Sequence, residues 1–348
     1  KASRAELDAW MEAESVMGAQ VVIGNTEEVL WIQNFGQRNV IDTGSVNART
    51  KFCIGSCSKP VISALCMVLV QDEGLKLDRE VGTWLPEFRD LKTVDGEASR
   101  APTLRELLAH RGGIYSQKKG MSRRQTGWIR NFKLSLEESV LGIAQEPLIA
   151  KPGEEYAYSG AGYCVIGRVL EVIYKTPIDE LLNEHLGQPL GFQSTSFFPD
   201  YSAPNFGTGS SNGKLNTSTP HLVRPFRFPL IGGSLYMTST DASKFLNMIL
   251  RQGVVGKKRL LSDKSFAEYM TPPFSDQPYG LGWRQVRREG ELVMINHSGA
   301  LASSRAIFIV NFKTGRYGAL LYTLGDLEKS NTAHGAGNRF MNRTVNRL

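Results

Sequence analysis

Ser56 and Lys59 have the residue types and the spacing for nucleophilic chemistry; they lie in the segment FCIGSCSKP (52–60). Residues three positions apart on an α-helix lie about 60° apart around its axis, so their side chains can touch. A serine hydroxyl needs a neighbouring base or cation, and a lysine can be either once burial lowers its pKa. The pair therefore predicts a serine nucleophile for acyl transfer. The competing interpretation is a serine N-cap followed by a lysine without function.

Two later segments carry groups that could join this pair, Tyr158–Gly160 and His297–Ala300. Together with the SxxK spacing, they resemble the three ordered motifs of the serine β-lactamase and penicillin-binding-protein superfamily. The likeness is strongest to its class C-like branch of esterases, DD-peptidases and β-lactamases, and it extends from about residue 21 to residue 323. The flanking segments that agree in order and spacing are LKLDREVGTWLPEF (75–88), PTLRELLAHRGGI (102–114), GGSLYMTSTDASKF (232–245) and YGLGW (279–283).

The resemblance implies a role for each of these residues. Ser56 attacks a carbonyl carbon and is acylated. Lys59, beside it, controls the protonation of the site. Tyr158 is the general base toward Ser56 and then toward water. A phenol with its usual pKa is a poor base at neutral pH, so a Lys59 cation is expected to lower the pKa of Tyr158. The backbone N–H groups of Ser56 and Ala300 would form the oxyanion hole. The other implied substrate-binding residues are Gly160, His297, Ser298 and Gly299. No metal ion or organic cofactor is implied.

Two positions depart from the usual motifs of the superfamily. Gly160 stands where the second motif usually has an asparagine that contacts the amide of the substrate, and His297 stands where the third motif often has lysine. A histidine near its usual pKa is mostly neutral at pH 7, so it stabilises an anion less than lysine would. The loss of the asparagine weakens the case for efficient β-lactam or peptide turnover and affects simple ester cleavage less, and both departures favour a permissive site. The predicted function is a serine hydrolase of esters, amides or β-lactams. A DD-peptidase and a catalytically weak scaffold or binding homologue remain as alternatives.

Three other patterns compete with this assignment. Lys313-Thr314-Gly315 matches the KTG form of the third motif, but it falls between two β-rich runs, where a turn is expected. The segment GSSNG (209–213) matches GxSxG but lacks the preceding strand and following helix that a nucleophile elbow needs. The basic stretch 118–133 contains Trp128 and Phe132 and could bind nucleic acid. No nucleic-acid motif accompanies this stretch, so a solvated loop, which could border a site for anionic substrates, is the preferred interpretation.

The elements that must position the motif residues indicate an α+β fold. Strand patterns lie at both ends of the chain, and helical patterns lie between them. The predicted strands cover 20–23, 29–35, 50–54, 292–296, 302–310 and 316–323, the last three as an antiparallel meander. The predicted helices cover 4–15, 56–73, 104–109, 136–144, 162–174, 178–186 and 331–348, and 206–219 is a polar loop. The resemblance implies a β-lactamase/transpeptidase-like fold, an antiparallel sheet flanked by helices with an inserted helical domain. Residues 1–77 and 225–348 form the predicted sheet domain, and 78–224 form the insert.

Composition limits the class of protein. The chain has 348 residues, of which 41% are hydrophobic and 22% charged, as in an ordinary globular protein. No run of about 18 apolar residues is present, so no integral membrane segment is expected. The four cysteines show no metal-binding spacing and are interpreted as free thiols. The resemblance favours the periplasm or secretion, whereas unpaired cysteines leave the cytoplasm open. The oligomeric state is not fixed by the sequence.

Overall fold

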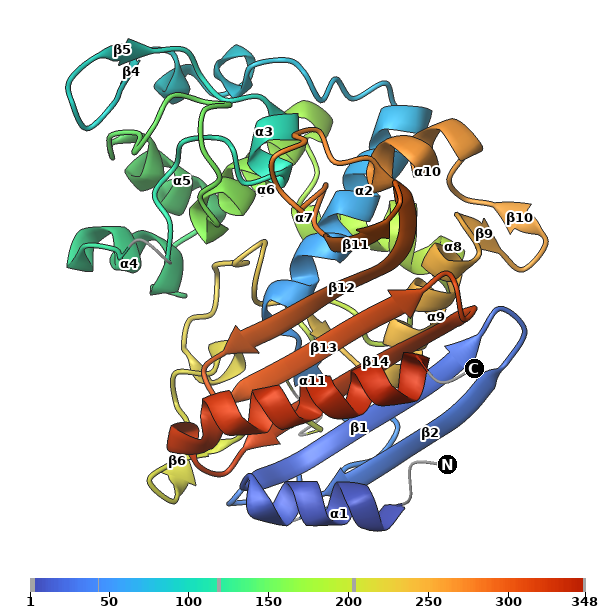
Figure 1. Cartoon of the computed structure of the whole chain (residues 1–348). Helices are drawn as coiled ribbons and strands as arrows, with labels where there is room; N and C mark the ends of the chain where they lie inside the picture. The colour runs from blue at the N-terminus through green and yellow to red at the C-terminus, as the bar shows by residue number, and fades with distance from the viewer. Residues whose placement is uncertain (1–3, 43, 118–119, 202–204, 347–348) are drawn as a thin grey trace.

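A six-stranded antiparallel sheet forms the centre of the protein in a computed structural model that describes residues 4–42, 44–117, 120–201 and 205–346 (Figure 1). The strands lie in the order β11-β12-β13-β14-β1-β2. Their bounds are β1 Val16–Asn25, β2 Val29–Gly36, β11 Arg284–Arg288, β12 Glu291–Leu301, β13 Ser304–Asn311 and β14 Arg316–Leu324. β1 pairs with β14, so the two ends of the chain meet in one sheet.

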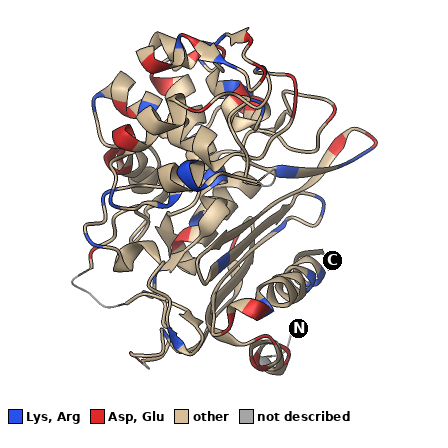
Figure 2. Cartoon of the chain, turned by 90° about the vertical axis from the view of Figure 1, so that its left-hand side faces the viewer, with Lys and Arg blue, Asp and Glu red and all other residues tan. Residues whose placement is uncertain are grey.

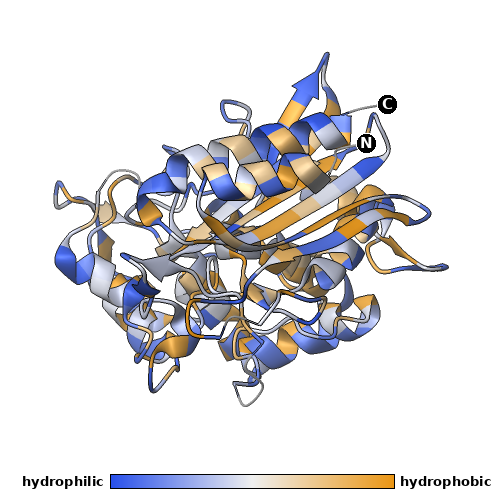
Figure 3. Ribbon diagram, turned by 90° about the horizontal axis from the view of Figure 1, so that it is seen from below, coloured by the Kyte–Doolittle hydropathy of each residue, from blue (hydrophilic) through white to orange (hydrophobic). Residues whose placement is uncertain are grey.

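The central strands alternate between two hydrophobic cores, as the period of two in a strand dictates. In β13, Phe308 belongs to the core on one face, and its neighbour Ile307 belongs to the core on the other. Helices α1 (Arg4–Ala13) and α11 (Ser330–Asn346) cover one face, and α9 (Ser239–Leu250) packs on the opposite one. Every residue of β13 is consequently buried. Figure 3 shows apolar colour along the strands, while the terminal helices are banded with polar residues.

The buried helix α2 (Ser58–Asp72) connects the sheet to a region rich in helices (Figure 1). Its residues from Ser58 to Leu69 are all buried, which fits a helix that is packed on every side. The helical region contains α3 Leu104–Leu108, α4 Arg123–Arg130, α5 Leu136–Ala144, α6 Gly160–Tyr174, α7 Ile178–Leu182 and α8 Gln188–Leu190. Capping boxes begin α3, α4 and α5. The division into a sheet domain and a 78–224 insert stays a prediction.

Short elements complete the architecture. The strands among them form two-residue pairs, β3 with β8, β4 with β5, β6 with β7 and β9 with β10. Their bounds are β3 Phe52–Cys53, β4 Leu91–Lys92, β5 Ala98–Ser99, β6 Ser210–Ser211, β7 Lys214–Leu215, β8 Tyr236–Met237, β9 Val254–Val255 and β10 Lys258–Arg259. The remaining helical elements are α10 Asp263–Met270 and the turns η1 Gly55–Cys57, η2 Val81–Thr83, η3 Pro86–Phe88, η4 Asn183–Gly187, η5 Pro220–Leu222 and η6 Leu327–Lys329.

The predicted α+β fold and the C-terminal meander are confirmed, but three local predictions were wrong. His297–Ala300 was expected between two strands and instead lies inside β12. The segment 206–219 was expected to be a loop, yet it forms the β6–β7 hairpin, and residues 206–210 are buried. The expected continuous helix from Ser56 is divided into η1 and α2.

The basic stretch 118–133 is folded into the helical region over its described part. Helix α4 begins with a capping box, and Arg124 forms an ion pair with Glu146. Trp128 donates a hydrogen bond to the same carboxylate at 3.1 Å, and Phe132 is buried in the core. Lys118 and Lys119 lie outside the described residues. Figure 2 shows short basic and acidic stretches of the ribbon interspersed with each other.

Three properties expected from composition can be compared with the described residues. The cysteines Cys53, Cys57, Cys66 and Cys164 are free and buried, as the prediction of free thiols required. Within 4–346, apart from the gaps already given, no helix is long and apolar enough to cross a membrane. The same residues contain no group of three or more His, Cys, Asp and Glu side chains that could hold a metal ion.

Candidate active site

The backbone turn η1 presents Ser56 at the start of α2. Ser56 is half-buried, whereas the residues on either side of it, from Phe52 to Gly55 and from Cys57 to Pro60, are buried. The Ser58 hydroxyl donates to the carbonyl of Gly55 at 2.6 Å and accepts from the N–H of Leu235 at 3.2 Å. These bonds hold the turn that carries the half-buried Ser56.

Lys59 lies directly beside Ser56. Its Nζ atom is 3.3 Å from the Ser56 Oγ atom and donates to the Gly232 carbonyl at 2.7 Å. The side chain is only 1% exposed, and this burial lowers the pKa of Lys59 to about 7. The positive charge of Arg130 lowers this pKa further. Near neutral pH a large fraction of the Lys59 amine is therefore neutral, and a neutral amine can act as a base.

Tyr158 completes the cluster from the other side. Lys59 Nζ lies 4.7 Å from the centre of the Tyr158 ring, and the Tyr158 and Ser56 side chains are hydrogen-bonded. Burial raises the pKa of Tyr158, and the hydrogen bond to Ser56 opposes the rise only in part. The pKa of this phenol therefore lies above its ordinary value, contrary to the expectation that Lys59 would lower it, because desolvation outweighs the hydrogen bond to Ser56. The phenol holds its proton more firmly than it would in water.

A network of buried bonds positions Tyr158 before helix α6. Ser116 donates to the Tyr158 carbonyl at 2.8 Å, and the Ser159 N–H donates to His110 Nδ1 at 3.1 Å. The His110 ring packs against the Tyr158 ring with a centroid distance of 4.3 Å. Ser159 is the N-cap of α6 and accepts from the N–H of Gly162 at 3.0 Å. The phenol is thus fixed through its own backbone and through a histidine ring that packs against it at a tilt of 45°.

Two facing glycines bring the predicted oxyanion donors together. A Cβ atom on Gly299 would lie 1.9 Å from the Ile54 carbonyl oxygen and 2.9 Å from the Ser56 nitrogen. A Cβ atom on Gly55, which has a φ of +53°, would lie 2.4 Å from the Ala300 nitrogen. Only glycines allow backbones to approach this closely. The nitrogens of Ser56 and Ala300 therefore border the same contact between η1 and β12.

His297 reaches this cluster through a second tyrosine. It is buried, its Nε2 atom lies 3.0 Å from the Tyr279 hydroxyl, and its Nδ1 atom lies 2.9 Å from the Ser298 carbonyl. A carbonyl only accepts hydrogen bonds, so Nδ1 carries a proton, and a neutral ring then accepts from Tyr279 at Nε2. The rings of His297 and Tyr158 are 6.3 Å apart. The Ser298 side chain is exposed, whereas Gly299 is buried.

Gly160, the remaining predicted residue, is buried and is the first residue of α6. Its N–H donates at 2.9 Å to the side chain of Gln117, a contact that was not predicted. The positioning roles of Gly232 and Tyr279 were also missed. Both residues lie in segments that matched the superfamily, so position within those segments was the available signal.

The competing motifs lie away from Ser56. Lys313 and Thr314 form the β13–β14 turn, where both N–H groups donate to the Asn311 side chain. This turn is at the opposite end of β13 from Arg305, which pairs with Ala300. The segment GSSNG (209–213) forms the β6–β7 hairpin instead of a nucleophile elbow.

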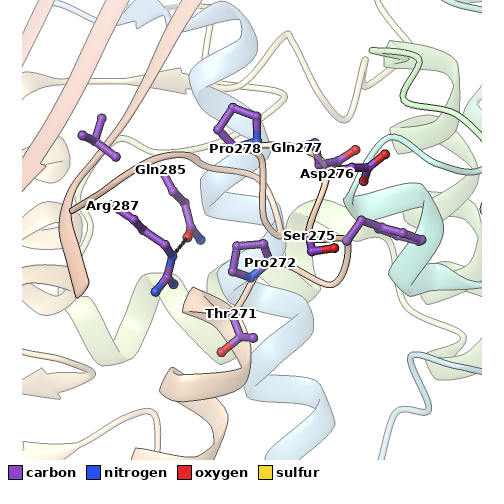
Figure 4. Close-up of a pocket in the computed structure, with 10 residues that line it drawn as sticks. Thr271, Pro272, Ser275, Asp276, Gln277, Pro278, Gln285 and Arg287 are labelled. Carbon is purple, nitrogen blue, oxygen red and sulfur yellow. Dashed lines mark hydrogen bonds between the residues drawn. The ribbon is translucent and has the colours of Figure 1, made fainter. Parts of the chain in front are cut away.

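An open depression of about 800 Å³ lies beside the loop that leads into β11 (Figure 4). The Gln277 side chain on its wall accepts from Arg111 at 2.8 Å and donates to the Tyr279 carbonyl at 3.0 Å. The depression therefore lies next to the segment that carries Tyr279, but neither Ser56 nor Lys59 lines it. Its lining residues are Thr271, Pro272, Phe274, Ser275, Asp276, Gln277, Pro278, Gln285, Val286 and Arg287.

Comparisons with known proteins show the family and the fold of the chain. Protein Rv1367c of Mycobacterium tuberculosis (strain ATCC 25618 / H37Rv) is 27% identical over 285 residues, covering 76% of this chain and 70% of that protein. The octameric penicillin-binding protein homologue from Pyrococcus abyssi is 22% identical, with a TM-score of 0.74 over 92% of this chain and 72% of the other. EstCE1, a hydrolase with promiscuous acyltransferase activity, is 19% identical, with a TM-score of 0.78 over 95% and 98%. A family model described as Beta-lactamase matches residues 4–338, and the chain therefore belongs to the Beta-lactamase family.

Proposed function

We propose that the chain is a serine hydrolase that forms an acyl-enzyme on Ser56 and acts on small esters, amides or β-lactams. The observation that carries this proposal is the pair of a half-buried Ser56 hydroxyl and the Lys59 Nζ atom 3.3 Å away. Burial lowers the pKa of Lys59 to about 7, so a large fraction of the amine is neutral at neutral pH. A neutral amine at this distance can accept the hydroxyl proton.

Acylation then uses Lys59 as the base and Tyr158 as the acid. The Ser56 oxygen attacks the carbonyl carbon, and its proton passes to the Lys59 amine. The N–H groups of Ser56 and Ala300 stabilise the oxyanion. On collapse, the bond to the leaving alcohol or amine breaks, and the leaving group takes the Tyr158 proton. The Lys59 ammonium then returns a proton to Tyr158, because burial raises the pKa of that phenol.

Hydrolysis of the acyl-enzyme repeats these transfers with water. Water attacks the acyl carbon while its proton passes to Lys59. The carbon–oxygen bond to Ser56 breaks, the acid is released, and Lys59 returns the proton to the Ser56 oxygen. An alcohol in place of water would give acyl transfer by the same steps.

Esters come first among the candidate substrates, and DD-peptidase activity comes second. The fold likeness to a hydrolase with acyltransferase activity supports the ester assignment. Gly160 has no side chain that could reach a peptide amide, which also favours simple esters. Because the fold is also similar to that of a penicillin-binding protein homologue, D-Ala-D-Ala peptides and β-lactams are included among the substrates to be tested. A scaffold without chemistry would not require an accessible Ser56 beside a base of lowered pKa.

Intact-mass measurement tests the proposal directly. The protein is incubated with a fluorophosphonate, a penicillin, a D-Ala-D-Ala peptide and a series of 4-nitrophenyl esters, with Ser56→Ala as the control. We expect one equivalent of adduct on Ser56 with the fluorophosphonate and turnover of at least one ester. The adduct mass and its lifetime then identify the substrate class. Complete absence of labelling in the folded wild type would support the scaffold alternative.

A further inference from the structure

The guanidinium group of Arg111 bonds to two segments that are far apart in the sequence. Arg111 follows helix α3, and only 5% of it is exposed. Its Nη1 atom donates to the carbonyls of Gly153 and Glu154 at 3.3 and 3.1 Å. Its Nε atom donates to the Gln277 side chain at 2.8 Å, and its Nη2 atom forms an ion pair with Asp276; both partners lie on the loop before β11 (Figure 4). One buried side chain therefore holds both segments.

These two segments carry the two tyrosines of the candidate site, Tyr158 and Tyr279. Their ring centroids are 6.3 Å apart, and the ring planes are at 90°. The ring of His110, the residue before Arg111, packs against both tyrosines, with centroid distances of 4.3 and 4.9 Å. The Gln277 side chain, which accepts from Arg111, also donates to the Tyr279 carbonyl at 3.0 Å. A displacement of either segment would therefore move a ring that borders the site.

The backbone around Arg111 is fixed to the Tyr158 segment. His110 has a φ of +60°, a left-handed conformation that a non-glycine residue keeps only where its surroundings hold it. The His110 carbonyl accepts from the N–H of Ala157 at 2.8 Å, and the Arg111 carbonyl accepts from the N–H of Gly153 at 2.7 Å. The main chain of residues 110–111 thus belongs to one side, and the Arg111 side chain extends from there to the other.

The shape of the guanidinium group is what allows it to span the two segments. Arginine presents five N–H donors in a rigid planar fork, whereas lysine has a single ammonium group at the end of a flexible chain. The fork directs hydrogen bonds to two carbonyls on one side and to an amide and a carboxylate on the other. The Phe274 ring, whose centroid lies 4.7 Å from the Arg111 Cζ atom, packs against the fork. A lysine at position 111 could bond to only one of the two sides.

We propose that Arg111 is a positioning residue that sets the separation of Tyr158 from Tyr279 and thereby the geometry in which Ser56 is acylated. It acts through these two rings, not through a contact with the substrate. A misplacement of about 1 Å caused by a substitution away from the reacting atoms can slow a reaction about a hundredfold. This inference rests on the proposed function, because it concerns the acylation of Ser56.

Arg111→Lys and Arg111→Met test the need for a group that spans both segments. A fluorophosphonate is used as the probe, and the limiting rate of labelling, kinact, is separated from the concentration for half-maximal rate, KI. We expect kinact to fall about ten- to a hundredfold in both variants, while KI stays unchanged. Lysine should not rescue the rate, although it keeps a cation beside Asp276. If Arg111→Met does not fold, Arg111→Lys decides the question.

Arg105→Met is the matched control. Arg105 also joins two distant segments, because it forms ion pairs with Asp78 and with Glu268 of α10. Neither partner lies in a segment that carries Tyr158 or Tyr279. This variant should lower the melting temperature but keep the wild-type kinact. All rates are measured at a temperature at which the melting curves show every variant to be folded.

Fluorine NMR gives a measurement of ring position that does not depend on activity. The protein is labelled with 3-fluorotyrosine, and the resonances of Tyr158 and Tyr279 are assigned from Tyr158→Phe and Tyr279→Phe. Both resonances should shift in Arg111→Lys, because the segments that carry the rings are no longer held together. In Arg105→Met they should stay at their wild-type positions.

The outcomes separate this inference from the proposed function. A wild-type kinact in Arg111→Lys overturns the positioning role, since a spanning group is then not needed. An unchanged kinact with a raised KI also overturns it, because Arg111 would then act on binding. An equal fall of kinact in Arg105→Met would assign the loss to general destabilisation and would overturn it as well. If the fluorophosphonate does not label wild-type Ser56, the proposed function fails first and the inference fails with it.

Discussion

Burial changes the proton affinities of Lys59 and Tyr158 in opposite directions. Removing either side chain from water disfavours its charged form, so the amine loses its proton more readily and the phenol holds its proton more firmly. The pair therefore rests as a partly neutral amine beside a neutral phenol. At the scale of single residues, this difference assigns the base and the acid of the proposed reaction.

The pH dependence of Ser56 acylation should follow the titration of Lys59. Because the base is active without its proton, we expect the rate of fluorophosphonate labelling to rise with pH through about 7 and then level off. Arg130 lowers the pKa of Lys59, so Arg130→Met should move the midpoint to higher pH. Stopped-flow labelling between pH 5.5 and 9 measures both.

Arg123 provides the matched control, since it is an exposed arginine on the same helix as Arg130. It does not contribute to the lowered pKa of Lys59, so Arg123→Met should keep the wild-type midpoint. A rate that falls as pH rises through 7 would instead mean that the ammonium form is the active one, and the roles of Lys59 and Tyr158 would have to be exchanged.

At the scale of elements, the contact between η1 and β12 determines whether the two predicted oxyanion donors face one carbonyl oxygen. The Cys57 thiol donates a hydrogen bond to the His297 carbonyl at 3.4 Å, in addition to the close approach of the backbones at Gly55 and Gly299. β11 pairs with β12 only as far as Asn296. Beyond that residue β12 is the edge of the sheet, so its backbone is free to face η1 and a substrate.

Gly299→Ala should separate these two elements. The new methyl group would meet the Ile54 carbonyl at 1.9 Å, so β12 or η1 has to shift. We expect acylation to fall at least a hundredfold, the usual effect of losing one oxyanion donor, while Ser56 remains in place. Labelling kinetics measure the loss, and a melting curve monitors the fold.

Gly335→Ala on α11 is the control for this substitution, because its nearest contact would be an ordinary 3.4 Å to Arg339. This variant should label at the wild-type rate. Wild-type kinetics in Gly299→Ala would show that the close approach of the two backbones has no part in the chemistry.

Sequence reasoning located elements with strong periodicity and missed those defined by tertiary contacts. The meander was predictable because β13 and β14 are continuous apolar runs, as strands covered on both faces require. The extension of β12 through Ser298 and Gly299 was not predictable, since serine and glycine favour turns in isolation. Helices α4, α9 and α10 were also not predicted. In the candidate site, motif spacing predicted Ser56, Lys59 and Tyr158, and the structure brings these three side chains together.

The partners that position the motif residues come from distant loops without a pattern of their own. Gly232 acts through its carbonyl, so its residue type says nothing about the bond to Lys59. His110 acts through a ring nitrogen that receives a backbone N–H from a residue 49 positions later. Long-range contacts of this kind become visible only once the fold places the two segments together.

At the scale of the whole molecule, the site lies at the start of the buried helix α2, which connects the sheet to the helical region. This position has a cost in stability, since Lys59 is an ionisable residue among buried apolar ones such as Val61 and Ile62. A buried lysine disfavours the folded state whenever it has to be protonated. The requirement for a base beside Ser56 is therefore met at the expense of stability.

Lys59→Met should make the protein more stable at low pH and remove the activity. In the unfolded chain Lys59 has its ordinary pKa of 10.5, and in the folded protein burial lowers the pKa to about 7. Between these values the unfolded state binds more protons, so the contribution of Lys59 to the free energy of unfolding rises with pH. The destabilisation is complete below pH 7 and disappears toward pH 10.5. We expect Lys59→Met to gain about 1–3 kcal/mol at pH 6, after the lost bond to the Gly232 carbonyl is counted.

Urea unfolding of wild type and Lys59→Met at pH 6 and pH 9.5 measures this gain, which should shrink at the higher pH. Lys257→Met is the control, because Lys257 is exposed and its removal should change stability little at either pH. An equal difference at both pH values would mean that Lys59 remains protonated in the folded protein. In that case the amine could not accept the Ser56 proton, and the base would have to be sought in Tyr158 despite its raised pKa.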